Sequence, residues 1–126
     1  MKKRTVIIST DGAEFQAELN HSALADLILG SLPISSDVNI WGEEIYFTIP
    51  VKSDIKNPVE SVEKGDIAYW PEGRAFCIFF GETPISSAGR IIPAGPVEII
   101  GRVVSGTEEL EGVRAGSRIK IENRGK

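Results

Sequence analysis

Residues 75–80, Ala-Phe-Cys-Ile-Phe-Phe, form a run without a charged side chain. A half-buried strand alternates apolar and polar residues, so this run predicts a strand that is covered on both faces. Side chains of a strand point alternately to opposite faces. One face therefore carries Phe76, Ile78 and Phe80, and the other carries Ala75, Cys77 and Phe79. One set must belong to the core, while the other meets a second layer of protein or lines a pocket.

A second strand, Ile67–Trp70, precedes this run, and Pro71-Glu72-Gly73 is the predicted turn between them. Proline fixes φ for an early turn position, and glycine supplies a positive φ at no steric cost. Tyr69 and Trp70 have opposite parity, so one of these two rings must leave the core.

Two further hairpins are predicted from short turn signals. Asp11-Gly12 lies between the strand candidates Thr5–Thr10 and Ala13–Leu19. Gly42-Glu43 lies between Asp37–Trp41 and Glu44–Ile49. Alternation within the last of these strands directs Ile45, Phe47 and Ile49 inward and Tyr46 and Thr48 outward.

The remaining chain predicts one main helix, two irregular segments and two more strands. Asn20 or Ser22 caps the helix, which runs to about Gly30 and has so little polar surface that we expect it to be mostly buried. The irregular segments are Pro50–Lys64 and Glu82–Gly95, the strands are Val97–Ser105 and Ser117–Glu122, and Thr107–Val113 is a candidate second short helix. About eight short strands in a small chain indicate a mainly β closed barrel or a sandwich.

Length and charge restrict the classes of protein. A chain of 126 residues, 41% hydrophobic and 25% charged, is predicted to form a single soluble domain over residues 1–126. Its net charge of −4 disfavours non-specific binding to nucleic acid or to anionic membranes. The basic cluster Lys2-Lys3-Arg4 is followed by an apolar run too short for a signal peptide or a membrane span, so we expect a cytoplasmic location.

Few residues are suited to metal, cofactor or nucleophilic chemistry. The single cysteine and single histidine exclude an internal disulfide, a thiolate zinc site and a histidine-rich metal site, and no phosphate-loop spacing is present, so neither metal nor cofactor is predicted. Cys77 is interpreted as a small buried hydrophobe rather than a nucleophile. The carboxylates that could serve acid–base chemistry are interpreted as solvated charges; they are Asp37, Glu43, Glu44, Glu60, Glu63 and Asp66.

Several segments resemble the cyclophilins. Val97–Gly106 is similar to the cyclophilin strand that reads apolar-apolar-Phe-Gly-basic-Val, Arg118–Gly125 to the closing strand, and Gly65–Phe79 to a strand, turn and Gln-Phe-Phe strand. The run Phe79–Ser86, with Tyr69-Trp70-Pro71, is closer to a small prokaryotic cyclophilin-like family of unknown function. This resemblance implies a closed eight-stranded β-barrel.

The residues of prolyl isomerase chemistry are not matched. The cyclophilin picture implies an arginine near the third strand, yet nothing basic occurs in Asp37–Thr48. The family's glutamine falls at Ala75 and its pocket phenylalanine at Cys77, and the loop Glu82–Val97 has neither tryptophan nor histidine. Prolyl isomerisation needs a donor aimed at the imide nitrogen. Arg74 and Arg90 are the nearby candidates for that donor.

Three functions follow as hypotheses. The first is a binding module whose apolar, aromatic cleft holds a peptide segment or a small molecule without arginine-dependent isomerase chemistry. The second is a weak or atypical peptidyl-prolyl isomerase, and the third is an enzyme of another class using the same cleft. The cleft is predicted to comprise Glu44, Tyr46, Thr48, Trp70, Arg74, Ala75, Cys77, Phe79 and Arg90. The oligomeric state is left open.

Overall fold

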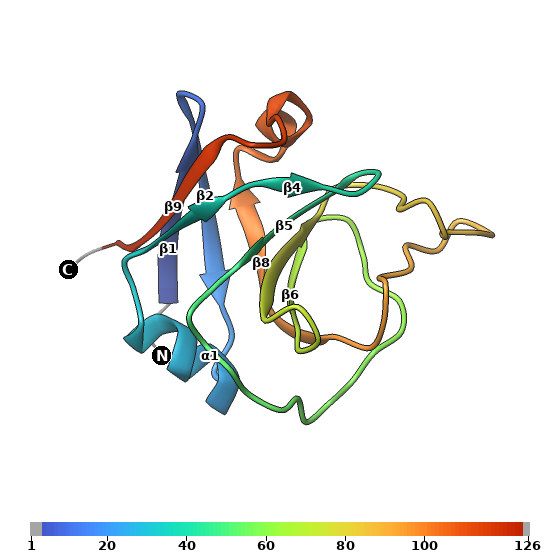
Figure 1. The fold of residues 1–126 in the computed structure, drawn as a ribbon, viewed down its shortest axis with the longest axis horizontal. Coiled ribbons are helices and arrows are strands. Elements are labelled where there is room, and N and C mark those ends of the chain that lie inside the picture. The colour runs from blue at the N-terminus through green and yellow to red at the C-terminus, as the bar shows by residue number, and fades with distance from the viewer. Residues whose placement is uncertain (1–3, 125–126) are drawn as a thin grey trace.

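A computed structural model describes residues 4–124, so Lys2, Lys3 and Gly125 lie outside the described residues. The chain is mainly β: a nine-stranded antiparallel sheet curls into a nearly closed barrel, with an α-helix at one end (Figure 1). The elements are β1 (Arg4–Thr10), β2 (Ala13–Leu19), α1 (Ala23–Gly30), β3 (Ile34–Asp37), β4 (Asn39–Ile40), β5 (Glu44–Thr48), β6 (Asp66–Trp70), β7 (Ala75–Phe79), β8 (Glu98–Ser105), the 3₁₀ helix η1 (Thr107–Gly112) and β9 (Arg118–Asn123).

The barrel closes because the two edge strands of the sheet, β3 and β4, follow each other directly in the chain. The strand order is β3-β9-β1-β2-β8-β6-β7-β5-β4. Only Val38 separates β3 from β4, so the chain leaves β9 and reaches β5 within a few residues. The Ser36 hydroxyl donates to the Thr48 carbonyl at 2.8 Å, which ties β3 to β5. Closure leaves little unpaired strand edge.

The break at Val38 explains the ninth strand. The sequence predicts one strand over Asp37–Trp41, whereas the structure has β3, which begins earlier at Ile34, and the short β4. Val38 itself pairs with the turn before β9, donating to the Ser117 carbonyl at 2.9 Å and accepting from the Gly116 amide at 2.8 Å. Asp37 and Asn39, both common turn residues, flank Val38, but neither glycine nor proline marks the change of partner.

Helix α1 closes one end of the barrel. Ser22 caps it, and its Oγ accepts from the Ala25 amide at 3.1 Å, which confirms one of the two predicted caps. The helix is less buried than expected, because Leu24, Ala25 and Ile28 pack inside while Leu27 is 52% exposed. Neither helix of residues 4–124 has the length and apolarity needed to cross a bilayer.

The strand Ala75–Phe79 is buried on both faces, as the uncharged run predicts. Phe76, Ile78 and Phe80 belong to the main core inside the barrel, where the rings of Phe47 and Phe76 stack with centroids 5.2 Å apart. Ala75, Cys77 and Phe79 belong to a second core on the outside of the barrel wall. The predicted division of side chains between the two faces is confirmed.

The second core lies under an outer layer made by the two irregular segments. Residues 50–65 and 80–97 pass over β6 and β7 on the side away from β1 and β9 (Figure 1). Two isolated bridges join them, Val59 with Val97 and Val62 with Ile91. Val62, Ile91 and Val97 complete the second core. The barrel wall is therefore sandwiched between two apolar layers on this side.

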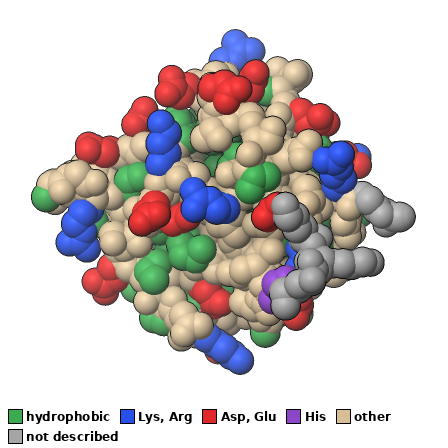
Figure 2. Space-filling model, turned by 180° about the vertical axis from the view of Figure 1, so that it is seen from behind, with side chains coloured by type: hydrophobic (Ala, Val, Ile, Leu, Met, Phe, Trp, Pro, Cys, Tyr) green, Lys and Arg blue, Asp and Glu red, His purple; other side chains and the backbone are tan. Residues whose placement is uncertain are grey.

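The face seen from behind Figure 1 has a mixed surface. Acidic and basic side chains are interspersed on it, with acidic ones gathered along the upper edge and only small hydrophobic areas (Figure 2). Elsewhere on the surface, Arg118 and Asp37 form an exposed ion pair at 3.1 Å. Exposed pairs of this kind contribute little to stability.

Candidate ligand-binding cavity on the outer face of the barrel

Strand pairing brings side chains of four neighbouring strands together on the outer face. Tyr46 on β5 lies opposite Asn39 on β4 and Cys77 on β7, and Cys77 lies opposite Ala68 on β6. Residues directly opposite in an antiparallel pair share a face. Tyr46 and Cys77 therefore stand side by side on the outer wall, beneath the outer layer.

The β4–β5 hairpin adds two residues to this face. Trp41 and Glu44 close its two-residue turn through paired backbone hydrogen bonds, Trp41 N to Glu44 O at 3.0 Å and Glu44 N to Trp41 O at 3.1 Å. The turn requires Gly42, which has a φ of 62° and lies against Pro84. The predicted Gly42-Glu43 turn thus places an indole and a carboxyl next to each other.

These residues line a cavity of about 280 Å³ that is partly open to solvent. For comparison, an engineered apolar cavity of about 150 Å³ holds benzene. Three aromatic side chains, one carboxyl, one thiol and a wall of small apolar residues surround the space. The lining residues are Trp41, Glu44, Tyr46, Trp70, Cys77, Pro93, Ala94 and Val97.

Glu44 is the acidic group of this cavity, and it is buried. Its side chain is 5% exposed, and no ion pair to it occurs among the described residues. Burial raises the pKa of Glu44 to about 7, an effect that its hydrogen bond with the Cys77 thiol partly offsets. The interpretation of Glu44 as a solvated charge is therefore wrong. Its predicted place in the cleft agrees with the structure, because Glu44 lines the cavity.

Cys77 is 1% exposed and matches its interpretation as a small buried hydrophobe. Burial raises the pKa of its thiol well above the usual value, and the neighbouring Glu44 carboxyl raises that pKa further. A nucleophilic cysteine needs the opposite shift. Cys77 thus contributes shape and a weak hydrogen bond rather than a thiolate.

The indole of Trp70 is held between two glycines. A Cβ at Gly73 would lie 2.7 Å from ring atoms Cε3 and Cζ3, and a Cβ at Gly95 would lie 3.3 Å from Nε1. The buried Nε1 has no hydrogen-bond partner among the described residues. Gly73 is therefore needed because the indole of Trp70 approaches it closely. The positive φ predicted for Gly73 is found instead at Arg74, whose φ is 47°.

The outer wall of the cavity is fixed by side-chain hydrogen bonds within residues 82–97. The Ser86 hydroxyl accepts from the amides of Thr83 at 2.9 Å and Ile92 at 3.0 Å. Thr83 Oγ1 in turn donates to the Ile92 carbonyl at 2.5 Å. The segment carries no regular secondary structure, so these contacts hold Pro93 and Ala94 over the strands.

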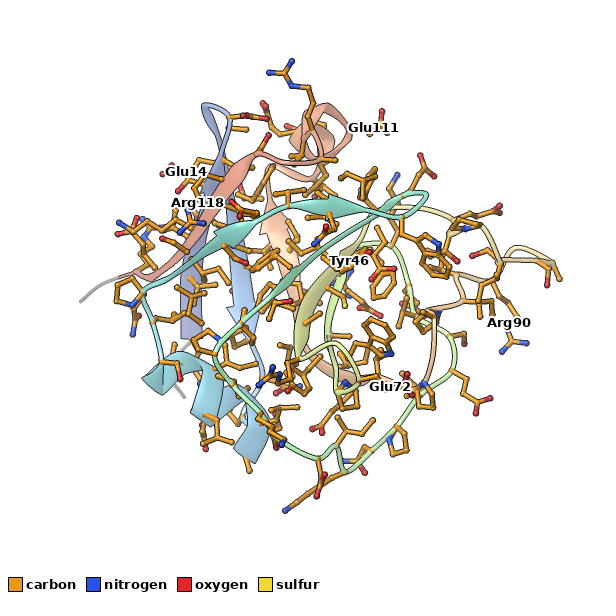
Figure 3. All side chains as sticks on the ribbon, viewed as in Figure 1. Glu14, Tyr46, Glu72, Arg90, Glu111 and Arg118 are labelled. Atoms are coloured by element: carbon orange, nitrogen blue, oxygen red, sulfur yellow. The ribbon has the colours of Figure 1, made fainter. Side chains whose placement is uncertain are left out.

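Four of the nine predicted cleft residues line the cavity: Glu44, Tyr46, Trp70 and Cys77. Ala75 and Phe79 point the same way but are fully covered within the second core. Thr48 is exposed at the end of β5, and Arg74 is exposed on the turn before β7. Arg90 extends from the outermost part of its loop, away from Tyr46 (Figure 3).

Four further lining residues were not predicted from the sequence: Trp41, Pro93, Ala94 and Val97. Trp41 could have been found, because residues flanking a two-residue hairpin turn are paired on one face. The other three lie in or next to an irregular segment, whose path depends on tertiary contacts.

Metal-binding groups are not gathered in this cavity. Throughout residues 4–124, no three His, Cys, Asp or Glu side chains are close enough together to hold a metal ion. The cavity offers a partly open apolar surface with one carboxyl, one thiol and three aromatic rings.

The chain is thus a nearly closed β-barrel with a short helix at one end and an aromatic cavity on its outer wall. A sequence model of the family described as Cyclophilin-like matches residues 4–122, and the chain belongs to this family. No curated protein matches it in sequence.

Two solved structures share this fold. The solution structure of the hypothetical protein AF2241 from Archaeoglobus fulgidus has a TM-score of 0.81 and 41% identity, covering 96% of this chain and 95% of that chain. The structure of McbB in complex with tryptophan has a TM-score of 0.69 and 15% identity, covering 96% of this chain and 45% of that chain. At 15% identity the second likeness shows the fold alone.

Proposed function

We propose that this protein is a binding module and that the cavity between β4, β5, β7 and residues 91–97 receives a small molecule or one side chain of a peptide. The observation that carries the proposal is the cavity's composition. Trp41, Tyr46 and Trp70 surround about 280 Å³ of space that is partly open to solvent. Ligand sites are typically concave and apolar, with few polar groups that fix orientation.

The arginine-dependent isomerase mechanism is not supported by this arrangement. Neither an arginine nor a lysine lines the cavity within the described part of the chain. Arg74 and Arg90, the two candidate donors, are both exposed outside it. We therefore expect no acceleration of proline isomerisation in a protease-coupled assay, and the same baseline for a variant carrying both Arg74→Ala and Arg90→Ala. Activity above baseline that this double variant loses would restore the isomerase hypothesis.

Binding is tested with the protein's own fluorescence. The chain has two tryptophans, and both line the cavity, so a fragment that enters it must alter their emission. A fragment screen of ring-sized compounds should yield binders whose ¹⁵N chemical-shift changes cluster at Glu44, Tyr46 and Cys77. Shift changes confined to other surfaces would contradict the proposal.

A blocking variant supplies the control. Ala94 is exposed at the cavity's outer wall, so Ala94→Phe should place a ring across the opening at little cost to folding. Ser87→Phe introduces the same ring in the same segment, away from the lining. Binding should be lost in the first variant and kept in the second.

An enzyme of another class is the second candidate, because a carboxyl with a pKa of about 7 in a cavity is suited to general acid–base catalysis. Its support is Glu44 alone. The enzyme hypothesis requires that a cavity ligand is chemically changed on incubation with the protein, and that Glu44→Gln abolishes this reaction. Ligands recovered unchanged would leave the binding module as the function.

A further inference from the structure

The cavity has an unbalanced charge. Glu44 is its one acidic group, and the side-chain partner of that carboxyl is a neutral thiol rather than a cation. Among the described residues every arginine that forms an ion pair does so with another acid elsewhere, namely Asp11, Asp26 or Asp37. An ionised carboxylate in an apolar environment without a counter-charge is strongly disfavoured.

The surrounding rings favour the same kind of ligand as the carboxylate. Trp41, Tyr46 and Trp70 all line the space that Glu44 faces. Aromatic faces attract cations through their quadrupole, and tryptophan does so most strongly. An anionic ligand would be repelled by the ionised Glu44, while a neutral ligand would gain nothing from its charge.

We propose that the ligand of this cavity is a small organic cation, an ammonium group on a compact apolar body, with Glu44 as its counter-charge and the rings of Trp41, Tyr46 and Trp70 around it. This inference rests on the proposed binding function and adds the charge of the ligand. A free amine and a lysine side chain share this chemistry, and both could enter a cavity that is partly open to solvent.

Binding should then depend on pH. The groups that face Glu44 are Trp41 on its own hairpin, Tyr46 on its own strand, Cys77 and Phe79 on β7, and the uncharged wall residues Pro93, Ala94 and Val97. The thiol stays neutral because burial raises its pKa. Ionisation of Glu44, with a pKa of about 7, therefore makes the cavity more attractive to a cation as pH rises from 6 to 8.

Three probes of one shape isolate the effect of charge. Choline is a permanent cation, 3,3-dimethylbutan-1-ol is its neutral counterpart, and 3,3-dimethylbutanoate is an anion of similar size. Tryptophan emission at pH 8 should give choline an affinity at least about tenfold above that of the alcohol, with no saturable response to the anion. At pH 6 the choline affinity should fall about tenfold, because choline itself does not titrate and the ionised fraction of the carboxyl falls by that factor.

The variant Glu44→Gln keeps the shape of the side chain and removes its charge. It should bind choline and the alcohol equally, with no change between pH 6 and pH 8. If this variant does not fold, the pH dependence of the unaltered protein decides the question. N-acetyl-lysine methylamide, compared with its norleucine counterpart, distinguishes the two sources: a lysine derivative that binds more tightly than choline would identify a peptide as the carrier of the ammonium group.

The outcomes separate the two proposals. Equal affinity for choline and the alcohol, or tighter binding of the anion, overturns the cation inference while the binding module stands. An absence of any response to these probes, together with a fragment screen that yields no cavity binder, overturns both.

Discussion

At the scale of single residues, Glu44 links the cavity to the stability of the chain. Its pKa rises from 4.5 to about 7 on folding, chiefly because the side chain is buried. The folded protein therefore holds a proton that the unfolded chain releases between these two values. Stability derived from this group is fully present below pH 4.5, decreases as pH rises, and is lost above about pH 7.

We expect Glu44→Gln to remove this dependence. The free energy of unfolding of the variant, relative to the unaltered protein, should increase between pH 5 and pH 8 by up to roughly 3 kcal/mol. Urea denaturation at the two pH values measures the difference. Glu72→Gln is the matched control, because Glu72 is an exposed acid on the turn between β6 and β7. The prediction would be contradicted if the free energies of unfolding of Glu44→Gln and the unaltered protein differed by the same amount at both pH values.

Trp70 shows how a glycine can be required by a neighbour rather than by its own backbone. Gly73→Ala would place a methyl group 2.7 Å from the indole, so the ring must move. We expect a loss of about 1–3 kcal/mol in stability, together with a shifted tryptophan emission and weaker cavity binding. Gly112→Ala serves as the control, since a Cβ there would meet nothing within 4 Å. Unchanged emission in Gly73→Ala would show that the ring is not clamped.

At the scale of elements, the sequence predicted strands and faces well where the signals were local. Each correctly predicted feature depends on steric or hydrogen-bonding preferences of a few adjacent residues. These features are the two-residue turns at Asp11-Gly12 and Gly42-Glu43, the Ser22 cap and the two faces of residues 75–80. The division of one expected strand at Val38 was missed because barrel closure, a long-range requirement, decides it.

The site was predicted in part for the same reason. Alternation along β5 and β7 identified Tyr46 and Cys77 as outward residues, but it could not distinguish outward residues that stay open from Phe79, which the outer layer covers completely. That difference depends on where residues 82–97 run. The segment has no regular pattern, so its position is visible only in the folded chain.

Ser86 is the residue that holds this segment in shape, and Ser86→Ala tests its role. Removing the hydroxyl leaves the amides of Thr83 and Ile92 without their partner, for which we expect a loss of about 1–3 kcal/mol. Hydrogen exchange at these two amides should accelerate, and ligands of the cavity should bind more weakly. Ser87→Ala is the control, because Ser87 is an exposed neighbour in the same segment. Equal exchange rates in both variants would mean that packing alone holds the wall.

At the scale of the whole molecule, the barrel and its outer layer are held together by different numbers of backbone hydrogen bonds. The barrel is held by continuous ladders, such as the seven paired residues of β1 and β2. The outer layer is joined by isolated bridges, in which Val59 donates to Val97 at 2.8 Å and Val62 donates to Ile91 at 3.0 Å. Segments with few ladder hydrogen bonds open at lower free energy than the core of a fold.

Native-state hydrogen exchange should therefore resolve two opening reactions. The amides of Val59 and Val62 should exchange through a local opening whose free energy is lower than that of the β1–β2 amides, which should exchange only on global unfolding.

A cavity ligand contacts both layers, since Tyr46 belongs to the barrel and Pro93 to the outer layer. Saturating ligand should raise the local opening free energy by RT ln(1 + [L]/Kd), provided that opening destroys the cavity. Ala94→Phe, which blocks the cavity, should abolish this increase. Exchange of Val59 and Val62 at the global free energy without ligand would instead mean that the barrel and its outer layer unfold as one unit, and that the cavity is as rigid as the wall on which it is built.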